Sequence, residues 1–117
     1  MNAEWNWQAP AITAPLGQAG RVGVNHDQPS QATTLYIHRL DTGNVDRSTM
    51  LERLNTDHVI YLQQKTQASS WHRYKLTGRA KLNNECWVLP VTTYAGSAQG
   101  TEPANAAPVI VSLPGDA

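Results

Sequence analysis

The segment Thr33-Thr34-Leu35-Tyr36-Ile37-His38 is the first of several that decide the fold. It alternates in character and is rich in β-branched and aromatic residues, which is typical of a β-strand. Three later segments share this pattern: Val59-Ile60-Tyr61-Leu62, Trp71-His72-Arg73-Tyr74-Lys75-Leu76 and Cys86-Trp87-Val88-Leu89-Pro90-Val91. The stretch from residue 33 to residue 91 therefore predicts a tight all-β module.

The size and charge of the chain limit what it can do. Its 117 residues suffice for one domain with its own core. Nine basic and nine acidic residues give a formal net charge of zero, so a dedicated nucleic-acid binder is not expected. Charged residues make up only 15% of the chain, and low charge favours association. We therefore expect a homo-oligomer, or a protein that contacts other subunits.

Two regions can be distinguished along the chain: residues 1–31, predicted to be an extended N-terminal arm, and residues 32–117, predicted to be the β module. Proline and glycine are too frequent in the arm for a regular helix or a central strand. Its apolar anchors are Trp5, Trp7, Ile12 and Leu16. We predict that these four residues bind a partner and that the arm is the main attachment element. The alternative is that the arm folds back on its own module.

Within the module, turn signals separate the predicted elements. Asp46 to Asn55 holds Met50, Leu51 and Leu54 at helical spacing, and Thr49-x-x-Glu52 resembles a capping box. A long polar loop from Gly96 to Pro103 precedes a terminal strand, Val109 to Leu113, which Pro114-Gly115 ends. About six strands with one short helix, of about two turns, predict a β-barrel or β-sandwich.

Residues suited to catalysis or metal binding are sparse. The four histidines show no metal-ligand spacing, and Cys86 is the single cysteine, expected to be a small buried hydrophobe on a strand. Ser97 does not stand at the centre of a Gly-x-Ser-x-Gly elbow. The acidic residues near the predicted turn and helix are explained by capping, although paired carboxylates can converge in space. We expect no catalytic residue, metal or cofactor.

Tryptophan and tyrosine are the aromatic residues, since the chain has no phenylalanine. Both combine an apolar ring with a polar group and are enriched at interfaces. Most of the aromatic residues of the module are expected to belong to its core; the alternative is that Trp71, Tyr74 and Trp87 form a stacking platform for a ligand. A barrel that stacks nucleic-acid bases is conceivable, but it would need a positive groove.

The sequence also bears on location. No apolar segment approaches the roughly 18 residues that suggest a membrane span, so we expect no membrane contact. The first ten residues lack a basic and an apolar signal region, which predicts a protein made in the cytoplasm.

The order of these segments resembles small β-structured proteins of tailed bacteriophage particles. The matching features are the Trp- and Pro-containing arm, the strand from residue 32, the turn Asp41-Thr42-Gly43, the short helix, the strand at 59–64, the Trp-x-x-Tyr-x-Leu-Thr-Gly segment at 71–78, the Val88-Leu89-Pro90-Val91-Thr92 strand and the Gly-rich loop. This resemblance covers roughly residues 32 to 113 and implies a capsid-decorating, head-fibre or tail-fibre module.

From this resemblance we expect a non-enzymatic virion protein, most directly a capsid-decorating or cement protein. Its partners would be the major capsid protein or other virion subunits. Two alternatives remain open: a tail-fibre or tail-associated module, and a carbohydrate-binding module that uses Trp71, Tyr74 and Trp87. An enzyme is the least expected class.

Overall fold

A computed structural model describes residues 2–93, 96–100 and 102–114. Within these residues, nine strands form one sheet: β1 (Asn2–Trp7), β2 (Arg21–Val24), β3 (Thr34–His38), β4 (Val59–Gln64), β5 (Trp71–Leu76), β6 (Lys81–Asn83), β7 (Cys86–Thr92), β8 (Ala98–Gln99) and β9 (Pro108–Ser112). A 3-10 turn, η1 (Pro29–Gln31), and one helical turn, α1 (Ser48–Leu51), complete the fold. The predicted all-β class is confirmed.

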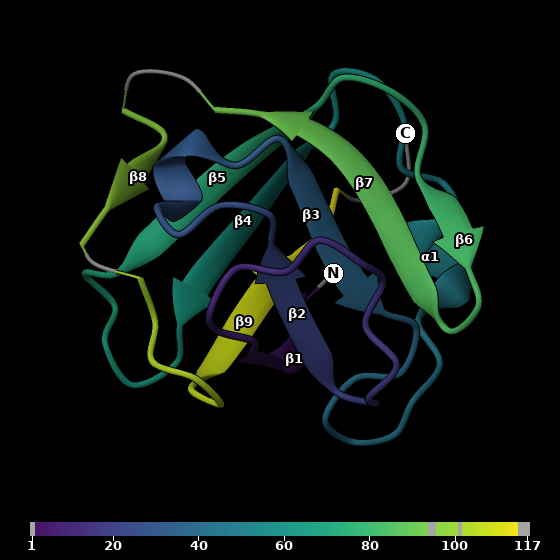
Figure 1. Cartoon of the computed structure of the whole chain (residues 1–117), viewed down its shortest axis with the longest axis horizontal. Coiled ribbons are helices and arrows are strands. Elements are labelled where there is room, and N and C mark those ends of the chain that lie inside the picture. Colours follow the sequence, from purple (N-terminus) through teal and green to yellow (C-terminus); the bar gives the residue numbers. More distant parts are fainter. Residues whose placement is uncertain (1, 94–95, 101, 115–117) are drawn as a thin grey trace.

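The strands follow the order β6-β7-β3-β2-β1-β9-β4-β5-β8 (Figure 1). The β1–β2 pair is parallel and the other pairs are antiparallel. The sheet curls until β5 meets β7, where Lys75 pairs with Thr92 and Leu76 with Val91. Within the described residues β5 and β7 pair at just these two positions, so the sheet closes on itself incompletely and does not form a regular barrel.

The predicted N-terminal arm is wrong as a description of residues 1–31. β1 lies inside the sheet, where it pairs with β9 from Asn2↔Ser112 to Asn6↔Pro108 and with β2 on its other side. Strand alternation turns Ala3, Trp5 and Trp7 toward the core and leaves the residues between them half-exposed or exposed. The segment folds back on its own module because this apolar face completes the core.

The connection between β1 and β2 covers the outer face of β3 and β7. Leu16 and Ile12 pack there with Tyr36, Cys86 and Val88 in a second, smaller apolar cluster. Gly23 lets this segment approach closely, since a Cβ at residue 23 would lie 3.1 Å from Ile12 Cδ1. Residues 8–20 therefore belong to the fold of this chain.

The predicted helix is shorter than expected. Helical structure is limited to α1, and its N-cap residue Arg47 makes no side-chain capping bond, so the predicted capping box is wrong. Instead, the Ser48 N–H donates to Asp46 Oδ1 at 2.9 Å. The predicted apolar face is confirmed, because Leu51 and Leu54 are buried and Met50 packs against the core.

The predicted loop at 96–103 also contains structure. β8 pairs with β5 through Trp71↔Gln99 and His72↔Ala98. Ser97 and Pro103 are buried, so the loop is not wholly a surface feature as its polarity suggested. Thr101 of this loop, and Gly115 of the predicted strand stop, lie outside the described residues.

Candidate functional site

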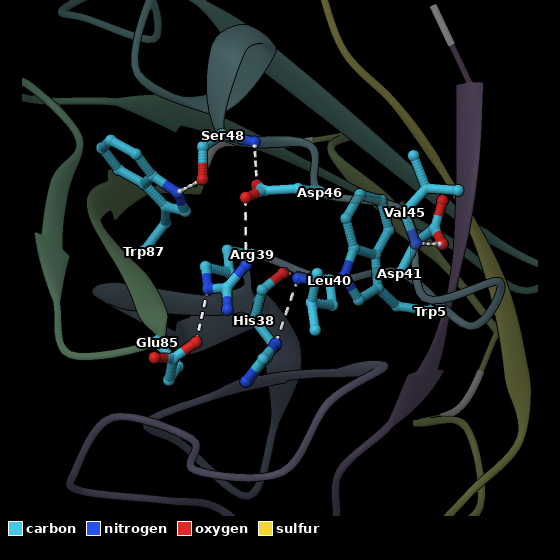
Figure 2. Close-up of polar contacts among 10 residues, drawn as sticks. All are labelled: Trp5, His38, Arg39, Leu40, Asp41, Val45, Asp46, Ser48, Glu85 and Trp87. Atoms are coloured by element: carbon cyan, nitrogen blue, oxygen red, sulfur yellow. Dashed lines mark hydrogen bonds and ion pairs between the residues drawn. The ribbon is translucent and has the colours of Figure 1, made fainter.

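Trp5 and Trp7, predicted to bind a partner, are core residues of this chain. Both side chains are fully or almost fully buried, at 0% and 1% exposure. The Trp5 indole N–H donates to the His38 carbonyl oxygen at 2.9 Å (Figure 2), and the Trp7 indole N–H donates to Glu102 Oε1 at 3.2 Å. Ile12 and Leu16 pack on Tyr36, Cys86 and Val88 of the same chain. The predicted attachment surface is therefore wrong, because intramolecular packing occupies all four side chains.

The stacking platform, which was the alternative to core placement, is not formed, because Tyr74 and Trp87 belong to the core. Tyr74 points into the core, where its hydroxyl donates to the Pro29 carbonyl oxygen at 2.9 Å. Burial and the nearby charge of Glu102 raise the pKa of Tyr74, so the phenol stays protonated. Trp87 is buried as well, and its indole N–H donates to Ser48 Oγ at 3.1 Å (Figure 2). Only Trp71 of the three predicted residues faces outward.

The polar groups around Trp5 and Trp87 hold the loop between β3 and α1 in place. Figure 2 shows Arg39 between two carboxylates, those of Glu85 and Asp46, and the Asp46 Oδ2–Arg39 Nη1 distance is 3.0 Å. The hydrogen bond to Glu85 is the main cause that raises the pKa of Arg39. His38 Nδ1 accepts the Leu40 N–H at 3.1 Å, and burial lowers the pKa of this imidazole. These groups support the fold.

Asp41 performs a similar role at the start of the same loop. Its Oδ1 accepts the N–H groups of Gly43 and Val45 at 2.8 and 3.1 Å, and its Oδ2 accepts Arg47 Nε at 2.8 Å. Burial alone would raise the pKa of this carboxyl, but the Val45 N–H, the Arg47 guanidinium and the Gly43 N–H outweigh it and hold the pKa below its usual value. Asp41 is therefore an ionised turn residue with its hydrogen bonds satisfied.

The outward face of β4 and β5 carries the candidate site. Trp71 stacks on Tyr61 with ring centroids 5.8 Å apart and an interplanar angle of 27°. Arg73 Cζ lies 5.2 Å from the centroid of the Trp71 ring, within the range of a cation–π contact. We define the Trp71 patch as Tyr61, Gln63, Trp71, Arg73 and Ile110, all of which are half-exposed.

Strand register extends this patch into a row across five strands. The paired residues are, in order, Glu4, Ile110, Gln63, Trp71 and Gln99. At the β1 end of the row, Lys65 Nζ lies 2.8 Å from Glu4 Oε1. The row ends in the polar residues Glu4 and Gln99, and between them the apolar residues Ile110 and Trp71 flank Gln63.

Hydrogen bonds hold the side chains of the Trp71 patch in position. Arg73 Nη2 donates to the Gly96 carbonyl oxygen at 2.6 Å, and Gln63 Nε2 donates to the Ala68 carbonyl oxygen at 2.8 Å. Side chains that are already ordered lose less conformational entropy when a partner binds. The patch can therefore act as a preformed binding surface.

Sequence reasoning selected Trp71 but missed Tyr61, Gln63 and Arg73. One signal was available, since alternation puts Trp71 and Arg73 on one face of their strand and Tyr74 on the other. The register that brings Tyr61 beside Trp71 could not be read from spacing within either strand.

Cys86 is buried, as expected, and burial raises the pKa of its thiol. Among residues 2–93, 96–100 and 102–114, no three His, Cys, Asp or Glu side chains lie close enough together to hold a metal ion. No helix in this described part is long and apolar enough to cross a membrane.

No family model, curated protein or solved structure matches this chain.

Proposed function

We propose that this protein is a non-enzymatic structural protein that binds other protein subunits through the Trp71 patch. The observation that carries the proposal is the clustering of Tyr61, Trp71 and Arg73 on one outward sheet face. Tyrosine, tryptophan and arginine are the residue types that most often dominate binding energy at protein interfaces. The low charge of the chain also favours association.

The resemblance to phage particle proteins supplies the biological setting of this proposal. Within that setting the protein decorates the capsid, with the major capsid protein or neighbouring copies of itself as partners in the virion. The Trp71 patch replaces the arm as the attachment surface, because Trp5 and Trp7 are buried in the core. A standard interface buries about 800 Å² on each partner, about one-seventh of the 5820 Å² surface of this chain. One face of the sheet can provide that area.

Mass spectrometry and cryo-EM of purified particles from the phage that encodes this chain test the proposal. We expect many copies per particle, with the β4–β5 face against the capsid surface. Trp71→Ala should weaken attachment by roughly tenfold or more, as for a hot-spot residue. Absence from particles, or one or two copies per particle, would contradict the capsid role; a few copies at the tail would favour a tail-fibre or tail-associated module.

The matched control is Lys75→Ala, on the same strand as Trp71. The Lys75 side chain is about half exposed, and its Nζ lies 3.8 Å from Asp57 Oδ1, outside the Trp71 patch. An equal loss of attachment in both variants would show that the patch has no special role.

A carbohydrate-binding module is the second candidate function. Trp71 remains half-exposed beside the amide groups of Gln63 and Gln99, which suits sugar hydroxyls. Binding on a glycan array that is lost in Trp71→Ala but kept in Lys75→Ala would favour this function. Particle attachment without glycan binding would reject it.

A further inference from the structure

A hollow of about 410 Å³ opens where η1 faces β8. In Figure 1 the short blue helical turn of η1 lies beside β8 and β5. One wall is residues 27–30, the other is formed by residues 98–100 and Glu102, and His72 of β5 completes the lining. The hollow is separate from the outward-facing Trp71 patch, because neighbouring residues on β5 point to opposite faces.

Contacts from the core fix both walls. The Tyr74 hydroxyl donates to Pro29 O at 2.9 Å and so ties down η1, while the Trp7 indole ties down Glu102. Gly100 has a φ of +84°, and a Cβ at residue 100 would lie 2.9 Å from Ser70 Cα. Only glycine allows the chain to pass so close, and the hollow is therefore preformed.

His72 is a buried polar group directed at the hollow. Its side chain is 5% exposed and its ring lies 6.4 Å from that of Tyr74. Within the described part of the chain, neither ring nitrogen makes a hydrogen bond. Burial lowers the pKa of this imidazole, so at neutral pH one nitrogen is an acceptor. A ligand in the hollow that donates to this nitrogen would supply the hydrogen bond that the protein does not.

The charge of the lining indicates what that ligand is. Asp27 and Glu102 contribute carboxylates, and no lysine or arginine is among the lining residues. The remaining polar lining groups, on Gln28, Ser30 and Gln99, are neutral. An ammonium group combines an N–H donor for the imidazole with a positive charge that the carboxylates elsewhere on the lining attract.

We propose that this hollow binds the primary ammonium group of a small organic cation, such as a lysine side chain or a free alkylamine. Asp27 and Glu102 supply the countercharge, and His72 accepts one N–H. Binding here is independent of attachment through the Trp71 patch.

Calorimetric titration of the full chain with Nα-acetyl-lysine N-methylamide tests the proposal. We expect saturable binding with a Kd of about 1 mM or tighter, and a changed ¹⁵N shift for the His72 ring. The norleucine analogue, which lacks the ammonium group, should not bind. Equal binding of the norleucine analogue, or no binding of the lysine probe, would overturn the proposal.

Two charge-neutralising variants locate the site. Glu102→Gln and Asp27→Asn should each weaken binding roughly tenfold. The matched control, Glu52→Gln, removes an exposed carboxylate beside α1 and should leave the affinity unchanged. If all three variants bind alike, the ammonium group does not sit in this hollow.

A comparison with n-butylammonium distinguishes the two sources of the cation. Equal affinity for butylammonium and the lysine probe supports a free amine, and a preference for the lysine probe supports a lysine of a protein partner.

Discussion

Replacement of Trp5 by alanine should cost far more stability than replacement of Trp71 by alanine. The Trp5 side chain is 0% exposed and donates a hydrogen bond to the His38 carbonyl oxygen. Truncation of a buried tryptophan costs about 3–5 kcal/mol, and the lost hydrogen bond adds about 1 kcal/mol. The total approaches the roughly 5–15 kcal/mol that stabilises a typical domain. Trp5→Ala should therefore be largely unfolded or melt at least about 15 °C lower.

The Trp71→Ala variant removes the same atoms from the opposite face. It loses the stacking on Tyr61, worth about 0.5–1.5 kcal/mol, and the contact with Arg73, worth about 0.5–1 kcal/mol. We expect a total cost of about 1–2.5 kcal/mol and an otherwise native protein.

Urea unfolding followed by far-UV circular dichroism measures both variants without relying on the removed indole. Trp5→Phe serves as an intermediate case, because it keeps an aromatic ring and loses the N–H donor; its cost should be about 1–3 kcal/mol. A cost below about 1 kcal/mol for Trp5→Ala would refute the placement of β1 in the core.

The structure makes four other predictions. Deletion of residues 2–20 removes β1 from between β2 and β9 and should leave a chain without cooperative unfolding in circular dichroism; a stable truncated module would contradict the sheet order. Asp41→Ala leaves the N–H groups of Gly43 and Val45 and the Arg47 guanidinium without their acceptor. The free energy of unfolding, measured by urea titration, should therefore drop by about 2–4 kcal/mol. An unchanged value would be inconsistent with these hydrogen bonds. Burial lowers the pKa of His72 and His38, so below about pH 6.5 the unfolded chain takes up protons that the folded chain does not. The free energy of unfolding, measured between about pH 7 and pH 5, should therefore fall as the pH falls. A flat profile would argue against two buried neutral imidazoles. Cys86 should react with a thiol reagent only when the protein unfolds, and rapid labelling of the native protein would show that the cover formed by Leu16 is open.

Local pattern was enough to predict the strands that contain β3, β4, β5, β7 and β9. In these segments the strand preference comes from alternation and β-branched residues within a few neighbouring positions, and the structure confirms a strand in each. The same reasoning failed for residues 2–7, although Ala3, Trp5 and Trp7 alternate with polar residues. Proline and glycine further along the segment outweighed that short signal.

The side of a strand on which a residue lies depends on local sequence, whereas the side chains that cover that residue depend on strand pairing. The alternation in β1 and β5 already shows that Trp5 and Trp7 share a side and that Trp71 and Tyr74 do not. It does not say what covers each side. For Trp5 the cover is the protein's own core, closed by β9 about a hundred residues later in the chain. The Trp71 patch likewise exists only because β4 and β5 pair in a register that sets Tyr61 beside Trp71. The strands and their alternation follow from local sequence. Strand pairing, in contrast, is a long-range interaction driven by burial of the whole apolar face. The core, the Trp71 patch and the His72 hollow therefore follow only from the tertiary structure.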